Sequence, residues 1–326
     1  MDNRFLLQRL PIVAIEEVFK LMNPFEIMQF ARISKKSKRL VQFVAKFSRF
    51  KTSLFIDDEI IFLIHIGDDF VSFRYKMKSD RKAIGTVRYI ESEDMYVQSE
   101  YSKGLEKIKK IVNFTNECLN LQMDRFVFNL NQFSKKNREI INWVKSLYPS
   151  SMQSITLHGK DVSHHEVNYC LAELSTKNLT IGVETKNNQP VIVPKSLDYL
   201  QIWSAKWVTL QHLLEFDTEL LKIWDGTLQN EELKVLLKKF KNLECHVNLK
   251  TFSYQMENLE SFDAITEGID NEFVDPEEWL EIEKHFGVRQ PAVNMKLMDG
   301  TVATMYSKVI PIGPIFEMRI ALVSDR

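Results

Sequence analysis

Short apolar segments recur at a nearly fixed interval through the middle of the chain. The segments at 179–181, 200–202, 221–223 and 243–245 each begin 21 or 22 residues after the one before. Two earlier segments of the same kind lie at 126–128 and 155–157. Helical apolar stripes alternate with these strands, at 105–119, 140–147, 163–174 and 227–240. One strand and one helix at such an interval predict a solenoid, in which each unit packs against its sequence neighbours.

The leucine positions assign a class to this repeat. Leu197, Leu200 and Ile202 fit the Leu-x-x-Leu-x-Leu spacing of leucine-rich repeats. The following unit departs from it, because Thr218 stands where the first leucine is expected. We therefore predict that residues 105–250 form a degenerate leucine-rich-repeat-like α/β solenoid within an α+β chain.

Both flanks of the repeats carry strand-like sequence. Residues 54–104 predict a β-rich segment, with strands at 54–56, 60–66 and 70–75. Residues 251–326 predict a C-terminal cap, in which a helix opens at Asp275 and Pro276. Strands that could pair as a small sheet follow at 293–297, 302–305 and 316–323.

The amino-terminal part predicts three short helices joined almost without loops. Pro11 suits a first helical position, and Ile12, Ile15 and Val18 then give the first helix an apolar face. The segment 23–26, Asn-Pro-Phe-Glu, ends that helix and opens the second with a capping box. A third apolar stripe begins at Leu40.

This helical module is too small to be stable alone. A chain of about 45 residues buries little of its surface and usually needs a partner or a staple. Apolar side chains also lie off the main stripes, at Val13, Leu21, Phe25 and Phe43. We therefore expect another protein or domain to cover part of the module.

Composition argues against several classes of function. The formal net charge is -1, which gives no general attraction to nucleic acid or to an anionic membrane. No apolar run approaches the roughly 20 residues that span a bilayer, and the amino terminus lacks the pattern of a signal peptide. Cys118, Cys170 and Cys245 are odd in number and far apart, which favours reduced thiols in a soluble intracellular protein, cytoplasmic or nuclear.

No motif predicts a catalytic, metal or cofactor site. Gly-x-Ser-x-Gly and phosphate-binding glycine loops are absent from the sequence. His164 and His165 are neighbours on a predicted helix and point in different directions, so a capping box over 163–166 explains them better than a metal does. Thr227 is predicted to cap a later helix. The basic run 35–39 is favoured as a solvated helix face over a nuclear signal or a phosphate contact.

Three tryptophans lie on or beside the predicted strands: Trp203, Trp207 and Trp224. A core position is the favoured interpretation of each. A surface anchor for a protein substrate is the alternative, because tryptophan is enriched at the centres of interfaces.

Two stretches of the chain resemble known families. Leu10-Pro11, the turn at 23–27 and the segment 31–38 (Ala-Arg-Ile-Ser-Lys-Lys-Ser-Lys) together resemble an F-box over residues 5–47. The segment 200–210 resembles the type 2 F-box-associated domain of the F-box family expanded in nematodes, and 299–304 adds a second piece.

The resemblance implies a function and a domain division. Residues 1–50 would be the F-box and residues 51–326 the substrate-recognition domain. The chain would bind a Skp adaptor, and through it the core of a cullin–RING ubiquitin ligase, without catalysis of its own. The adaptor-facing positions would be Leu10, Pro11, Ile12, Ile15, Val18, Pro24, Phe25, Ile27 and Leu40. A repeat-type interaction scaffold without ligase attachment stays open as the alternative.

Overall fold

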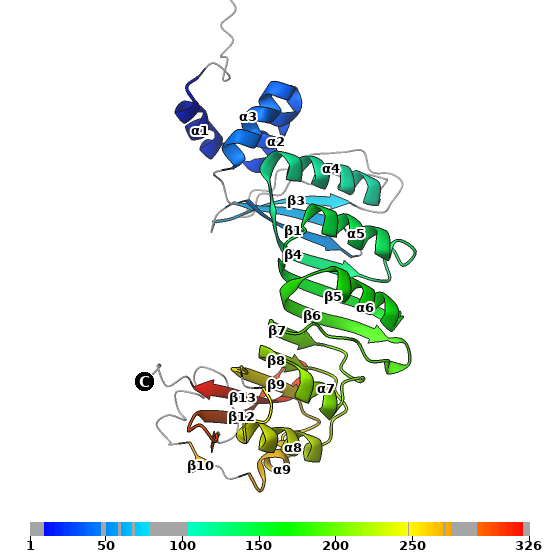
Figure 1. Cartoon of the computed structure of the whole chain (residues 1–326), viewed down its shortest axis with the longest axis vertical. Coiled ribbons are helices and arrows are strands. Elements are labelled where there is room, and N and C mark those ends of the chain that lie inside the picture. Colours follow the sequence, from blue (N-terminus) through cyan, green and yellow to red (C-terminus); the bar gives the residue numbers. More distant parts are fainter. Residues whose placement is uncertain are drawn as a thin grey trace, which may run out of the picture. The chain divides into compact units, whose positions relative to one another are not determined.

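The computed structural model describes residues 10–46, 50–57, 60–66, 69–77, 104–246, 248–269, 272–274 and 292–321. The chain divides into two compact units, Met1–Gln153 and Ser154–Arg326, shown in Figure 1. No helix within the described ranges is long and apolar enough to cross a membrane.

The first unit joins helices to a four-stranded sheet. Its elements are α1 Ile12–Leu21, α2 Pro24–Ile33, α3 Lys35–Ala45, β1 Phe50–Ile56, β2 Ile60–Ile66, β3 Asp69–Met77, α4 Gly104–Leu119, β4 Gln122–Asn129 and α5 Asn137–Leu147. The strand order is β4-β1-β2-β3. β1 is parallel to β4 and antiparallel to β2, which is antiparallel to β3. The three predicted helices and the predicted strands of this region are present.

The caps of the first helices follow from the sequence. Asn23 Oδ1 accepts the backbone N–H of Glu26 at 2.9 Å, and Glu26 Oε2 accepts the N–H of Asn23 at 2.9 Å, so the predicted capping box is confirmed. Pro24 occupies the first helical position. Ser34 opens α3, because its hydroxyl accepts the N–H of Ser37 at 3.0 Å. Pro11 is the N-cap of α1 and not its first helical residue, so the helix begins one residue later than predicted, at Ile12.

The second unit continues the alternation of strands and helices. Its elements are β5 Met152–Val162, α6 His164–Glu173, β6 Thr176–Thr185, a 3₁₀ turn Lys186–Asn188, β7 Leu197–Ile202, α7 Leu210–Glu215, β8 Thr218–Ile223, α8 Asn230–Lys241, β9 Thr251–Gln255, α9 Ser261–Thr266, β10 Glu272–Phe273, β11 Val293–Lys296, β12 Val302–Ile310 and β13 Gly313–Ala321. The strand order is β10-β11-β12-β13-β9-β8-β7-β6-β5.

Consecutive strands lie side by side in the repeat region. β6, β7, β8 and β9 are parallel and follow the order of the sequence. Leu200 is paired with Leu179 on one side and with Leu221 on the other, and each of the three is at most 1% exposed. The core is thus a ladder of leucines between the sheet and the helices. The predicted strand-and-helix alternation is present in these units.

The C-terminal strands β11, β12 and β13 form the predicted antiparallel sheet. β13 also pairs with β9 in antiparallel direction, so this small sheet extends the repeat sheet. The helix predicted to open at Asp275 lies outside the described residues.

The strand predicted at 243–245 is wrong. After α8 the chain turns at Leu243, whose φ of 56° is in the left-handed region. Glu244 donates its backbone N–H to the carbonyl of Lys239 at 2.9 Å, the bond that closes a Schellman motif at a helix end. The next strand is β9, which begins at Thr251.

Two predicted helix caps also differ. Ser163 precedes α6, but its side chain makes no cap hydrogen bond there. The N-cap of α8 is Gln229, two residues beyond the predicted capping position of Thr227. Gln229 donates its backbone N–H to Glu232 Oε2 at 3.0 Å, so this pair replaces the hydroxyl cap that the sequence predicts.

Candidate functional site

Burial divides the nine positions that we expect to face an adaptor. Ile15 is 3% exposed, Ile27 is 4% exposed and Pro24 is buried, so these three pack inside the helical module. Their side chains support the surface of the module from within. Pro11 is exposed and Ile12 is 41% exposed.

The remaining positions are intermediate. Leu10, Val18 and Leu40 are half-buried, and the side chain of Phe25 lies outside the described residues. Contact with an adaptor stays a prediction for all nine positions. The accessible part of this surface is carried by Leu10, Pro11, Ile12, Val18 and Leu40.

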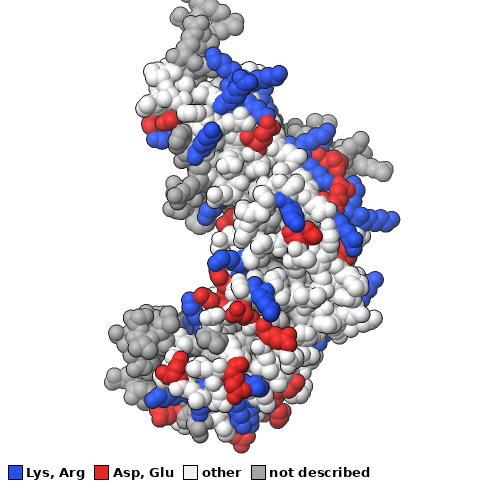
Figure 2. Space-filling model, in the orientation of Figure 1, with Lys and Arg blue, Asp and Glu red and all other residues white. Residues whose placement is uncertain are grey.

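Further apolar side chains of the helical module reach the surface. Val13 is 65% exposed, Leu21 is 87% exposed and Phe43 is 43% exposed, as their positions off the main stripes predict. The sequence does not predict the exposure of Ile33, which is 73% exposed, because Ile33 continues the apolar pattern of α2 to the last residue of the helix. The basic run 35–39 lies on α3. Lys and Arg side chains gather on this part of the surface in Figure 2.

Helix α4 covers another side of the helical module. Gln42 donates to the backbone carbonyl of Glu117 at 3.0 Å, and Lys38 forms an ion pair with its carboxylate at 2.5 Å. Arg32 and Lys38 lie over the ring of Phe114, 5.4 and 5.3 Å from its centroid. We expect another domain or protein to cover part of this small module, and α4 covers one side of it.

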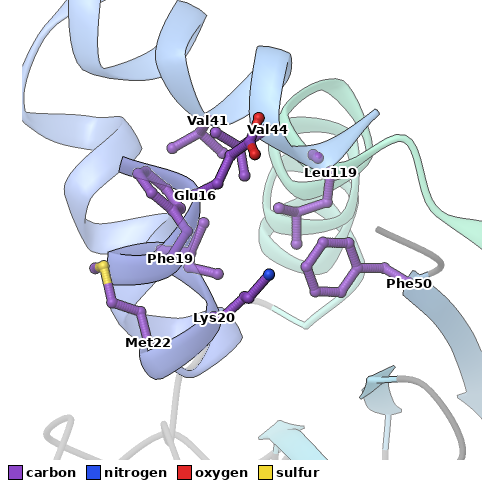
Figure 3. A pocket seen from close by; sticks show the side chains of 10 residues that line it. Glu16, Phe19, Lys20, Met22, Val41, Val44, Phe50 and Leu119 are labelled. Atoms are coloured by element: carbon purple, nitrogen blue, oxygen red, sulfur yellow. The ribbon is translucent and has the colours of Figure 1, made fainter. Parts of the chain in front are cut away.

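A groove remains between the helical module and α4. It has a volume of about 230 Å³ and is apolar at its base, where Phe19, Val41 and Leu119 meet. Figure 3 shows these side chains converging from α1, α3 and α4, with the Lys20 ammonium directed into the open space.

In the second unit the three tryptophans have different roles. Trp203 is 43% exposed, whereas Trp207 is 4% and Trp224 is 5% exposed. The rings of Trp203 and Trp224 lie against each other, with centroids 5.9 Å apart. Trp207 packs against His212, with centroids 5.6 Å apart. Trp203 is thus the surface candidate, and the other two belong to the core.

A buried charge cluster lies farther along the same sheet. Glu317 on β13 is 3% exposed and accepts hydrogen bonds from Tyr306 at 2.5 Å and from Arg319 at 2.7 Å. Its other oxygen lies 2.7 Å from the ammonium of Lys308. Burial alone would raise the pKa of Glu317, but the hydrogen bonds from Lys308 and Tyr306 outweigh it and lower the pKa. Glu317 is therefore an ionised carboxylate whose charge is compensated inside the sheet.

Nucleophilic and metal chemistry find little support among the described residues. Burial raises the pKa of Cys118 and Cys245 to about 11 and that of Cys170 to about 12, so all three thiols stay protonated and unreactive. No group of three His, Cys, Asp or Glu side chains in the described ranges is arranged to hold a metal ion. His164 and His165 stack on each other, with ring centroids 3.9 Å apart.

Comparison with known proteins assigns two parts of the chain. No curated protein and no solved structure matches it. Residues 190–254, which run from the segment before β7 into β9, match the family model described as F-box associated. Residues 7–48, which contain α1, α2 and α3, match the F-box domain. The resemblance that the sequence shows is thereby confirmed: the chain carries an F-box domain at its amino end and an F-box-associated segment in its repeat region.

Proposed function

We propose that this chain is the substrate-recognition subunit of a Skp–cullin–F-box ubiquitin ligase. The F-box would bind the Skp adaptor, and the second unit would hold a protein substrate near the ligase core. The observation that carries the proposal is the F-box match over a helical module whose apolar side chains are exposed. Such a subunit has no catalysis of its own and acts in the cytoplasm or the nucleus.

The exposed side chains can support a tight interface. Fully burying a side chain such as Ile, Val or Leu is worth about 1.5–3 kcal/mol. Ile12, Val13, Leu21 and Ile33 are between 41% and 87% exposed, so a partner would gain much of that value at each one it covers. The sum from these four positions, about 4–8 kcal/mol, offsets a large part of the cost of association, which is about 4–15 kcal/mol.

We further place the repeat region among degenerate leucine-rich-repeat-like solenoids. The support is the parallel order of β6 to β9 and the leucine ladder through Leu179, Leu200 and Leu221. A surface built from several stacked strands suits recognition of a protein, because each strand adds side chains at one regular spacing.

Adaptor binding tests the function. The full chain is co-expressed with a Skp adaptor and purified, and its affinity is measured by titration. We expect a stable complex, and we expect Ile12→Asp to weaken it about tenfold or more, because a charge would be buried there without a partner. Ile192→Asp is the control, since Ile192 is 74% exposed and lies in the second unit. A chain that does not bind the adaptor contradicts the function, and unchanged affinity of Ile12→Asp contradicts the proposed surface.

The alternative is an interaction scaffold without ligase attachment. It is favoured by the second unit, which has its own core. A scaffold would keep all its partners when the F-box is disabled, whereas a ligase subunit would keep its substrate and lose the adaptor. Comparing the proteins that co-purify with the intact chain and with Ile12→Asp separates the two functions.

A further inference from the structure

Among the described residues, the helices lie on one face of the strands β6 to β9 and leave the other face uncovered (Figure 1). Side chains alternate between the two faces of a strand, and Leu200 and Ile202 of β7 lie in the core at 1% and 0% exposed. Tyr199, Gln201 and Trp203 therefore lie on the opposite face, which we call the strand face. Figure 1 shows α6 and α7 on the other side of these strands.

The register places Lys222 at the centre of the strand face. Lys222 on β8 is paired with Gln201 on β7 and with Ser253 on β9. Trp203 follows Ile202, which is paired with Ile223, so Trp203 and Trp224 are neighbours one row farther along.

Lys222 has no carboxylate partner in the described part of the chain. Other lysines near this face are paired: Lys160 lies 3.9 Å from Glu184, and Lys206 lies 3.3 Å from Asp225. The ammonium of Lys222 lies instead over the ring of Tyr199, 5.7 Å from its centroid. A ring orients the cation but leaves its hydrogen-bond donors available.

Glu317 on β13, the strand next to β9, cannot supply the missing charge. Glu317 is two strands away from Lys222, because Lys222 is paired with Ser253 and Ser253 with Glu317. Both Glu317 oxygens already accept hydrogen bonds or ion pairs from Tyr306, Arg319 and Lys308.

A second donor lies beside Lys222. The hydroxyl of Tyr199 donates to Gln201 Oε1 at 2.5 Å, which uses the amide oxygen and leaves the amide N–H groups of Gln201 as donors. Two donor groups without an acidic acceptor favour an anion, and a carboxylate can accept from both at once.

Trp203 gives the same surface an apolar anchor. Its backbone N–H donates to the carbonyl of Ile181 at 2.8 Å, and its ring rests on Trp224, so its position is fixed. Gly182 lies beside it on β6, where a Cβ atom would be 3.9 Å from the Cβ of Trp203.

We propose that the strand face binds an extended segment of the substrate that carries an acidic side chain two residues from a large apolar one. Lys222 and Gln201 would hold the carboxylate, and Trp203 would pack against the apolar side chain. Strand residues rise about 3.3 Å each, so the rows of Lys222 and Trp203 are about 7 Å apart. This is also the separation of residues two apart in an extended peptide. The inference rests on the proposed function, which makes a protein substrate the ligand.

Peptide selection tests the inference on the full chain. Random twelve-residue peptides displayed on phage are selected against the purified protein, and the enriched peptides are synthesised and titrated. We expect Asp or Glu about two positions from Trp, Phe or Leu. Lys222→Met and Trp203→Ala should each weaken binding about tenfold or more. Lys222→Glu should shift the selection to peptides with Lys or Arg. Lys206→Met is the matched control and should leave affinity unchanged, since Lys206 is already paired with Asp225.

Several outcomes would overturn the inference. The first is a selection in which Asp and Glu are not enriched. The second is equal binding of the same acidic peptides by Lys222→Glu. The third is tighter binding of a phosphoserine peptide than of the carboxylate peptide. Folding of each variant is checked by its circular dichroism spectrum and melting temperature. Adaptor binding is measured on the same samples, so loss of peptide preference with adaptor binding intact refutes this inference alone. Failure of the intact chain to bind the adaptor refutes the proposed function.

Discussion

Removing the carboxylate of Glu317 should destabilise the second unit strongly. Glu317 is 3% exposed and forms a 2.7 Å ion pair with the ammonium of Lys308, whose side chain is 17% exposed. In Glu317→Ala the largely buried ammonium of Lys308 loses this carboxylate. Removing one member of a buried ion pair costs about 3–5 kcal/mol, because the remaining charge is left uncompensated. This loss is a large fraction of the stability of a typical domain, which is about 5–15 kcal/mol.

The chain offers a matched control for this change. Lys250 and Glu219 form an ion pair at 2.8 Å in the same unit, about as short as the 2.7 Å pair of Lys308 and Glu317. The two side chains of the control pair are 48% and 44% exposed. Water screens them, so Glu219→Ala should cost at most about 1 kcal/mol. Distance is thus held nearly constant while burial varies.

Equilibrium unfolding in urea measures both variants. Tryptophan fluorescence reports mainly on the second unit, since Trp203, Trp207 and Trp224 lie there and Trp143 lies in the first unit. We expect a loss of at least about 3 kcal/mol in the free energy of unfolding for Glu317→Ala. Removing the paired cation as well, in Glu317→Ala with Lys308→Met, should recover part of that loss. A loss below about 1 kcal/mol for Glu317→Ala, equal to that of Glu219→Ala, would refute the reasoning.

Further predictions concern pH, a helix cap and the thiols. The pKa of Glu317 is lowered in the folded chain, so its contribution to stability is present above the unfolded pKa of about 4.3 and is lost as the pH falls through the folded pKa. Urea midpoints of the wild type should therefore fall below that pH, and those of Glu317→Gln should fall less. Asn23→Ala should destabilise the F-box helices by about 1 kcal/mol, and Asn23→Asp should not, as judged by melting temperature. Iodoacetamide at pH 8 should leave Cys118, Cys170 and Cys245 unmodified until the chain is unfolded, which mass spectrometry can count.

The sequence predicts elements well where one local rule decides the structure. The interval of 21 residues between the strands at 179–181, 200–202 and 221–223 has a direct structural cause. Parallel neighbours in order need a nearly constant length of chain for each turn of the repeat. β6, β7 and β8 accordingly contain those segments. The capping box at Asn23 and Glu26 is equally local, because all its atoms lie within four consecutive residues.

The failures occur where two structures compete for the same residues. Leu243 follows an apolar helix and resembles the first residue of a strand, yet it takes a left-handed φ of 56°. Glycine usually occupies such a position, and a leucine there gives no warning of a turn. Ile15 and Ile27 show a different limit. Their spacing identifies an apolar face, but a core and a partner surface require the same side chains, and only burial separates them.

The proposed binding surface of the second unit could not be predicted from the linear sequence. Lys222 is one of 43 Lys and Arg residues, and nothing beside it in the chain distinguishes it. Its significance depends on register: Gln201, 21 residues earlier, and Ser253, 31 residues later, flank it without a negative charge. Lys160, by contrast, lies 3.9 Å from Glu184, which compensates its charge. The register of the strands therefore sets the charge of this surface, and a shift of β8 by one residue would move Lys222 from the strand face into the core.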